Sequence, residues 1–174
     1  ENKGLEEAFN YFCMEIEPYI KPYTDALNKK LMASPFVHQL DQETYFTYLR
    51  GVEKEIRLFH ESNIALSAEL NMLAQQYGSI TGKMSVTIEG KEYTLQQAAK
   101  FLMQSNRDLR KEVYHQVNER RRQDEAELNQ LFDQLLQKRH QVALNAGFEN
   151  YRDYKFEELG RCDDTGQNGE NLED

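Results

Sequence analysis

Apolar residues along this chain recur mainly at three- and four-residue steps, which is the spacing of amphipathic helices. The first stripe of this kind consists of Phe9, Phe12, Ile16, Tyr19, Tyr23, Leu27 and Leu31. Pro18 and Pro22 fall inside it, and proline cannot donate a backbone hydrogen bond. The pattern therefore predicts a helix that is kinked or divided near residues 17–21.

Two further helices are predicted after the break at Ser34-Pro35. Asp41 is a suitable N-cap for the first, whose apolar stripe is Tyr45, Leu49, Val52, Ile56 and Phe59. Residues 60–63 indicate a short interruption. The stripe then resumes at Leu66, Leu70, Leu73 and Tyr77. We expect Gly78 to end this helix.

Residues 84–95 change to a period of two, which predicts a β-hairpin. Met84 to Ile88 form the first alternating run, Glu89-Gly90 make the turn, and residues 91–95 can pair back. Thr94 and Gln97 have the spacing of a capping box, so a helix should start at Leu95.

The longest helical run lies between a predicted cap at residues 105–108 and Gly147, which should end it. Residues 118–127 are almost wholly polar, so the helix either breaks there or bridges two packed regions. Together these elements predict a mainly all-α fold, an antiparallel helical bundle with one small β-hairpin near residues 84–95.

Composition narrows the function classes. The 174 residues suffice for one domain with a core, and a net charge of −9 with a pI near 5.0 argues against binding nucleic acid. The basic run at residues 120–122 is followed by acidic residues and is typical of a solvated helix face. We expect no membrane span and no secretory signal. Cys13 and Cys162 indicate reduced thiols and a cytoplasmic protein, and the missing initiator Met suggests an excised or processed segment.

Zinc peptidases place two His one helical turn apart in the motif HExxH. His60-Glu61 begins that motif, but Ile64 occupies the second ligand position, which favours a solvated helix end. Glu112 and His115 form a single ExxH, the spacing of di-iron bundles, and a second copy is missing.

The other candidate groups are also better explained by structure than by chemistry. His115 and Glu119 are expected to form a surface pair. Cys13 should behave as a small buried hydrophobe, and the acidic surroundings of Cys162 disfavour a thiolate. The sequence therefore predicts no catalytic, cofactor-binding or metal-ligating residue in this chain.

Residues 145–156, NAGFENYRDYKF, place aromatic residues and the charge pair Arg152-Asp153 directly after a helix end. This block resembles a segment of oligoendopeptidase F-like, thimet-type zinc metallopeptidases. Residues 31–49, LMASPFVHQLDQETYFTYL, and residues 77–102, YGSITGKMSVTIEGKEYTLQQAAKFL, are similar to the amino-terminal part of the same family. With residues 139–156, the likeness covers roughly residues 5–161.

The resemblance implies a non-catalytic helical lobe that forms a wall of the peptide-binding channel. In that family the HExxH helix, which binds zinc, lies in the later half of the polypeptide. The family's enzymes cleave short peptides. The implied partners are therefore the missing catalytic lobe and short peptides, zinc belongs to the parent enzyme, and this chain alone should be inactive.

The resemblance stops at Arg161, after which CDDTGQNGENLED departs from the family pattern. We therefore divide the chain into a helical lobe with an inserted hairpin at residues 1–161 and a loosely ordered acidic tail at residues 162–174. The alternative function is a stand-alone helical protein-interaction module without activity. A metal-storing bundle is a weaker third hypothesis.

Overall fold

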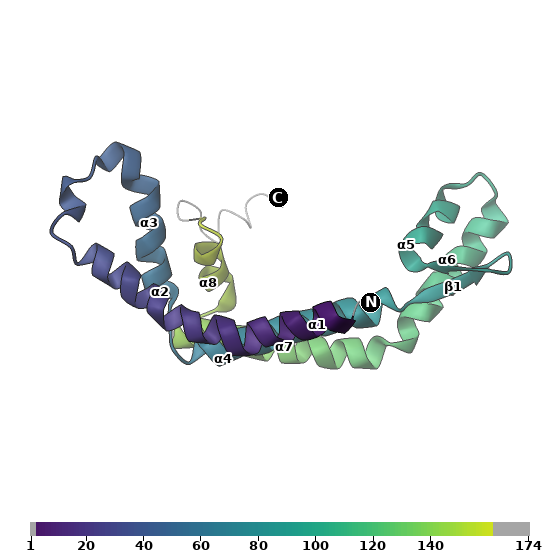
Figure 1. Cartoon of the computed structure of the whole chain (residues 1–174). Helices are drawn as coiled ribbons and strands as arrows, with labels where there is room; N and C mark the ends of the chain where they lie inside the picture. Colours follow the sequence, from purple (N-terminus) through teal and green to yellow (C-terminus); the bar gives the residue numbers. More distant parts are fainter. Residues whose placement is uncertain (1–2, 162–174) are drawn as a thin grey trace. The chain divides into compact units, whose positions relative to one another are not determined.

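The computed structural model describes residues 3–161, and these form helices and one two-stranded antiparallel sheet (Figure 1). The mainly helical fold class with a small hairpin is thus confirmed. The described residues fall into two compact units: unit 1 contains residues 3–71 and 137–161, and unit 2 contains residues 72–136. The predicted tail at 162–174, including Cys162, lies outside the described residues. Within the described part, no helix is long and apolar enough to cross a lipid bilayer.

Unit 1 begins with α1 (Lys3–Tyr11), the π-helix η1 (Phe12–Ile16) and α2 (Glu17–Met32). The irregularity lies one turn earlier than the sequence indicated, because Pro18 and Pro22 are accommodated inside α2. A proline ring collides with the carbonyl four residues before it, and for Pro18 that residue is Met14, inside η1. The wider π turn, closed by Glu17 N–H to the Phe12 carbonyl, relieves this collision.

A 3₁₀ turn, η2 (Val37–Gln39), leads to α3 (Gln42–Leu58), which packs against α2. The predicted N-cap is confirmed, because the Asp41 carboxylate accepts from the Glu43 amide at 3.3 Å and from the Thr44 hydroxyl. These hydrogen bonds, with that from Thr44 the strongest, lower the pKa of Asp41. Asn28 Nδ2 donates to Glu55 Oε2 at 2.9 Å and joins α2 to α3.

α4 (Asn63–Gly82) begins after the predicted interruption but does not end at Gly78, so that prediction is wrong. A glycine stops a helix by adopting a positive φ, and Gly78 keeps a negative one. The helix continues for another turn, with the Thr81 hydroxyl bonded to the Tyr77 carbonyl at 2.8 Å.

Unit 2 holds β1 (Ser85–Ile88), β2 (Lys91–Thr94), α5 (Leu95–Ala98), the 3₁₀ helix η3 (Ala99–Met103) and α6 (Arg107–Gln123). The hairpin and the Thr94–Gln97 capping box are confirmed. One face of the hairpin packs on α5, η3 and α6 in a core of Val86, Ile88, Ala98, Phe101, Val113 and Val117. This packing supplies the support that an isolated hairpin lacks.

The polar stretch at residues 118–127 contains a helix break. α6 ends at Gln123 and α7 (Glu125–Asn145) begins one residue later, with Asp124 at φ −103°. The Asp124 side chain accepts from Arg120 at 2.5 Å. Of the two alternatives that the sequence left open, the break is the one observed.

Gly147 ends α7 as predicted, at φ +83°. The Phe148 amide donates to the Ala143 carbonyl at 2.9 Å and the Gly147 amide donates to Leu144 at 3.0 Å, which is a Schellman motif. A helix that the sequence pattern did not reveal, α8 (Tyr151–Glu158), follows at once.

Candidate functional site

The aromatic block at residues 148–156 serves packing and capping in unit 1. The Asn150 side chain accepts from the Asp153 amide at 3.0 Å and its Nδ2 donates to Asp153 Oδ2 at 2.9 Å. Hydrogen bonds from Asn150 and then Arg152 lower the pKa of Asp153. This network fixes the first turn of α8.

Aromatic and charged contacts then attach α8 to α3 and α7. Phe148 meets Tyr154 edge to face at 5.5 Å between ring centroids, and Arg57 of α3 lies 5.8 Å from the Phe148 ring. Arg57 also forms an ion pair with Glu157, and Lys54 donates to the Glu158 carbonyl at 3.2 Å. The block therefore joins α8 to the neighbouring helices of unit 1.

Unit 1 contains a hollow of about 410 Å³ between α2, α3, α4 and α8, which we call the α2/α3 hollow. Asp25 lines it, with Oδ2 at 2.6 Å from Lys29 Nζ and a buried Oδ1 that has no hydrogen-bond partner among the described residues. Tyr154 of α8 also lines it. Burial, together with the nearby Glu158 and Tyr151, raises the pKa of Tyr154 to about 12.

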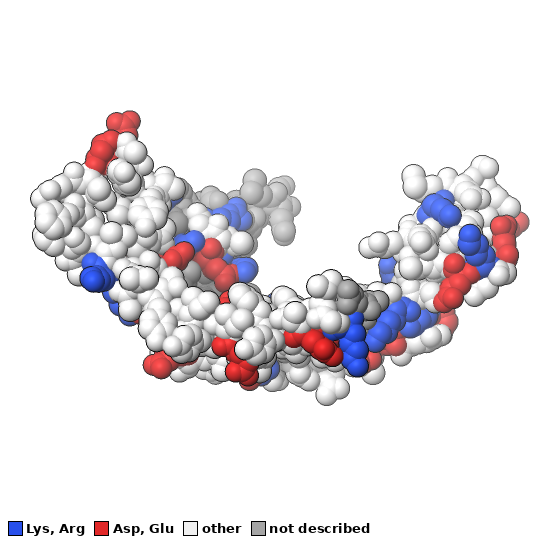
Figure 2. Space-filling model, in the orientation of Figure 1, with Lys and Arg blue, Asp and Glu red and all other residues white. Residues whose placement is uncertain are grey.

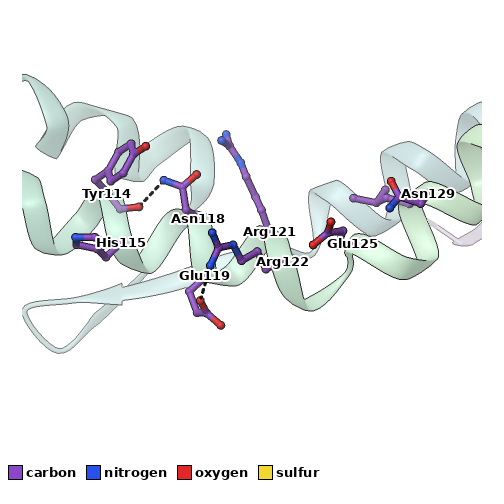
Figure 3. Close-up of a pocket in the computed structure, with 9 residues that line it drawn as sticks. Tyr114, His115, Asn118, Glu119, Arg121, Arg122, Glu125 and Asn129 are labelled. Atoms are coloured by element: carbon purple, nitrogen blue, oxygen red, sulfur yellow. Dashed lines mark hydrogen bonds and ion pairs between the residues drawn. The ribbon is translucent and has the colours of Figure 1, made fainter.

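Unit 2 contains a hollow of about 560 Å³ where α6 meets α7, the α6/α7 hollow (Figure 3). Most of its lining residues are polar or charged, and both signs of charge are present: Tyr114, His115, Asn118, Glu119, Arg121, Arg122, Glu125, Leu128 and Asn129. Asn118 Nδ2 donates to the Tyr114 carbonyl at 2.7 Å, and Arg122 lies 4.0 Å from Glu119. Exposed ion pairs such as Arg122–Glu119 contribute little to folding stability.

A third hollow, of about 640 Å³, runs along β1 beside α6 and is called the β1 groove here. Ser85, Val86 and Thr87 form one wall. The other wall comes from α6 and consists of His115, Gln116, Glu119, Arg120 and Gln123. His115 and Glu119 line both unit 2 hollows, so the two are neighbours on α6.

The residues weighed from the sequence as metal ligands do not converge. His60 sits at the end of α3, where its Nδ1 accepts from the Ser62 amide at 3.3 Å. Glu119 pairs with Arg122 rather than with His115. Among residues 3–161, no three His, Cys, Asp or Glu side chains come together in a group that could hold a metal ion.

Cys13 is buried in η1, as expected of a small hydrophobe, and Asn71 Nδ2 lies 3.9 Å from its Sγ. The basic run is solvated or paired, with Arg120 bound to Asp124 and Arg122 exposed.

Sequence reasoning missed the three hollows and the buried Asp25 oxygen. Each hollow is lined by residues from separate elements, and periodicity places such residues on a helix face without saying what faces them. One signal for the third hollow was present in the sequence: a hairpin of two strands with no third strand predicted beside it leaves strand edges free.

Comparison with known proteins gives a family match at the start of the chain. Residues 1–59 match the model of the Peptidase M3 N-terminal domain. A search of curated protein sequences finds no significant match.

Solved structures share the fold over nearly the whole chain. One described as an oligoendopeptidase F superposes with a TM-score of 0.87 at 24% identity over 95% of this chain. Pz peptidase A with an inhibitor gives 0.87 at 24% over 96%. A protein described as an oligoendopeptidase F from Bacillus anthracis str. Ames gives 0.87 at 22% over 95%.

This chain spans only 29–30% of the length of those structures. Identities of this size show a shared fold. Together with the match of residues 1–59, they confirm the resemblance to the amino-terminal part of oligoendopeptidase F-like metallopeptidases.

Proposed function

We propose that this chain is the non-catalytic helical lobe of a zinc-dependent oligopeptidase and forms a wall of its peptide-binding channel. The parent enzyme hydrolyses peptide bonds of short peptides, and the partner of the lobe is the catalytic part of the same polypeptide. Its location is the reducing cytoplasm, which the free thiol of Cys13 supports.

One observation carries this proposal: the fold matches over 95–96% of this chain but over only 29–30% of the solved peptidase structures. If this chain is one lobe of a larger enzyme, it should match almost completely while covering a minor part of the enzyme, as these percentages require.

The surface of unit 1 favours the lobe over a stand-alone interaction module. A self-sufficient module should be polar all round, whereas α2 exposes Ile20 at 48%, Tyr23 at 58% and Leu27 at 66% of their surfaces. The stripe continues toward the amino terminus through Leu5, Phe9, Phe12 and Ile16. Broad areas of unit 1 in Figure 2 carry neither Lys, Arg, Asp nor Glu. Contiguous exposed apolar surface of this kind marks an interaction face.

The described residues do not fit the zinc that the family implies, because no group of three ligand side chains exists among them. Under this proposal the zinc ligands and the general base belong to the catalytic part of the parent enzyme. The contribution of this chain is to exclude large substrates and to hold peptides against that lobe.

The proposal is tested by comparing the 174-residue chain with the full polypeptide from the same reading frame. The reading frame should encode HExxH after residue 174. With zinc and a quenched fluorescent peptide, the full polypeptide should cleave and a chelator should abolish cleavage, whereas the 174-residue chain should not cleave. Chelator-sensitive cleavage by the 174-residue chain would refute a non-catalytic role, and a reading frame without HExxH would refute the parent enzyme.

A further inference from the structure

The turn of the hairpin determines which backbone N–H and C=O groups of β1 point away from β2. Glu89 and Gly90 both have positive φ, +52° and +76°, as in a two-residue type I′ turn. Such a turn closes with a hydrogen bond between Ile88 and Lys91, which are partners in the register. Hydrogen-bonded and non-hydrogen-bonded pairs then alternate along the ladder.

It follows that Val86 and Ile88 use their backbone groups in the hairpin, while Ser85 and Thr87 direct theirs away from β2. The opposite strand supports this assignment. Thr94, the register partner of Ser85, has its N–H bonded to Gln97 Oε1 at 3.1 Å instead of to the ladder. No backbone hydrogen bond of Ser85 or Thr87 is formed with any other part of the described chain.

These unpaired groups border the β1 groove. The Val86 and Ile88 side chains belong to the core, whereas Ser85 and Thr87, whose backbone groups are directed away from β2, line the groove between β1 and α6. Its far wall is the polar side of α6, with Gln116 and Gln123 between charged neighbours. An added strand lies about 4.8 Å from its neighbour. The groove, about 640 Å³ in volume, is the space beside Ser85 and Thr87 that such a strand would enter.

We propose that the β1 groove binds an extended peptide, which joins the hairpin as a third strand against Ser85 and Thr87. Up to four backbone hydrogen bonds form, two with each of these residues. Because they involve only peptide backbone, binding is tolerant of side chains, as suits an enzyme that accepts many short peptides. This inference rests on the proposed function for the identity of the peptide as substrate.

A peptide fits the groove better than a second copy of the chain does. Strand pairing between two copies would bring a second α6 against the same edge, because α6 flanks β1 in each copy. A short peptide carries no such flanking helix.

Hydrogen exchange observed by NMR tests the binding mode. The probe is the blocked peptide acetyl-Thr-Val-Thr-Val-Thr-amide added to the 174-residue chain. The amides of Ser85 and Thr87 should exchange quickly in the free chain and at least about tenfold more slowly with saturating peptide, while Val86 and Ile88 are protected throughout. Unchanged exchange at Ser85 and Thr87 with peptide would overturn the proposal. Protection of both before peptide is added, with a concentration-dependent dimer, would assign the edge to a second copy and also overturn it.

Two N-methylated peptides provide a matched pair. Methylation of the second and fourth residues leaves the odd-numbered amides free to face β1, so binding should be retained. Methylation of the third and fourth residues blocks every register that uses two successive facing amides, so affinity should fall by about tenfold or more. Equal affinities for the two peptides would exclude strand addition.

Two variants of Thr87 distinguish the contribution of its backbone N–H to peptide binding from that of its side chain. Thr87→Pro removes the outward N–H without removing a ladder hydrogen bond and should weaken peptide binding by about tenfold. Thr87→Val keeps the N–H and should bind as the parent chain does. The NMR shifts of the Phe101 ring protons report whether the hairpin core persists in Thr87→Pro. If the core is lost in this variant, the two methylated peptides still decide whether the peptide binds by strand addition. None of these measurements needs catalysis, so failure here leaves the test of the proposed function unaffected.

Discussion

At the scale of single residues, Asn63 holds together segments that are far apart in the sequence. It is 6% exposed, its Nδ2 donates to the Val142 carbonyl at 2.9 Å, and its Oδ1 accepts from Asn145 Nδ2 at 2.8 Å. A buried amide that is satisfied on both sides fixes one arrangement of α4 against the end of α7 within unit 1.

Asn63→Ala should lower the free energy of unfolding by about 1–3 kcal/mol, because it leaves the Asn145 amide without its buried acceptor and removes the bond to Val142. Urea denaturation followed by circular dichroism measures the change. Asn71→Ala is the control, since the side-chain contact that Asn71 makes among residues 3–161 is a long one, to Cys13 Sγ at 3.9 Å. Equal losses for the two variants would show that the Asn63 network contributes no special stability.

Tyr154 gives unit 1 a dependence on alkaline pH. Its pKa is raised from 10.0 to about 12, first by burial and then by Glu158 and Tyr151. Below pH 10 the phenol is neutral in both states; between pH 10 and about 12 the unfolded chain loses the proton while the folded chain retains it. The stabilisation is therefore complete below pH 10 and lost as the pH rises through about 12.

Tyr154→Phe should make the stability of the chain less sensitive to pH in that window and should remove a late-titrating phenol from the absorbance titration at alkaline pH. Tyr23→Phe is an informative comparison, because a hydrogen bond to Tyr19 raises the pKa of Tyr23 at an exposed site. If Tyr154→Phe leaves the titration curve unchanged, the raised pKa of Tyr154 is contradicted.

At the scale of elements, local chemistry explains what the sequence could predict. The caps at Asp41 and Thr94, the turn at Glu89-Gly90 and the terminator Gly147 each act through neighbours within a few residues. Features that depend on tertiary contacts were not predictable. Helix α8 was hidden because its short apolar pattern is completed by Phe148, α3 and α7. The π turn is a local effect of Pro18, and it lies before the prolines because the collision falls four residues earlier in the chain.

The glycines at 147 and 78 illustrate this limit and yield a paired prediction. Each was proposed as a helix stop, but only Gly147 has a positive φ, and a Cβ at either position would meet no atom of the described residues within 4 Å. Gly147→Ala should therefore destabilise by about 1–2 kcal/mol through backbone strain alone. Gly78→Ala should stabilise by about 0.5–1 kcal/mol, because alanine is the better residue inside a helix.

Thermal unfolding of the two variants beside the parent chain measures both effects. The Gly147 variant should melt lower and the Gly78 variant higher. A lower melting temperature for Gly78→Ala would indicate that α4 needs a flexible point there and would restore the boundary that the sequence pattern indicated.

At the scale of the whole chain, the apolar stripe that predicted the first helix takes on a different meaning in the structure. Its periodicity correctly indicated a helix, yet in unit 1 most of the stripe is exposed while Cys13 beside it is buried. Periodicity identifies an apolar face and does not identify its partner. Under the proposed function, the partner is the catalytic lobe.

The double variant Ile20→Lys/Leu27→Lys tests that interpretation, because these residues are seven apart on α2 and both are exposed. We expect it to reduce binding of a hydrophobic fluorescent dye and any self-association of the 174-residue chain, and to change the free energy of unfolding by no more than about 0.5 kcal/mol. Gln130→Lys/Gln137→Lys is the matched control, with the same spacing, the same added charge and exposed polar starting residues on α7. If both double variants reduce dye binding equally, added charge accounts for the effect. If neither double variant reduces dye binding, the exposed apolar residues of α1 and α2 do not form a docking face. The stand-alone module then becomes the better explanation.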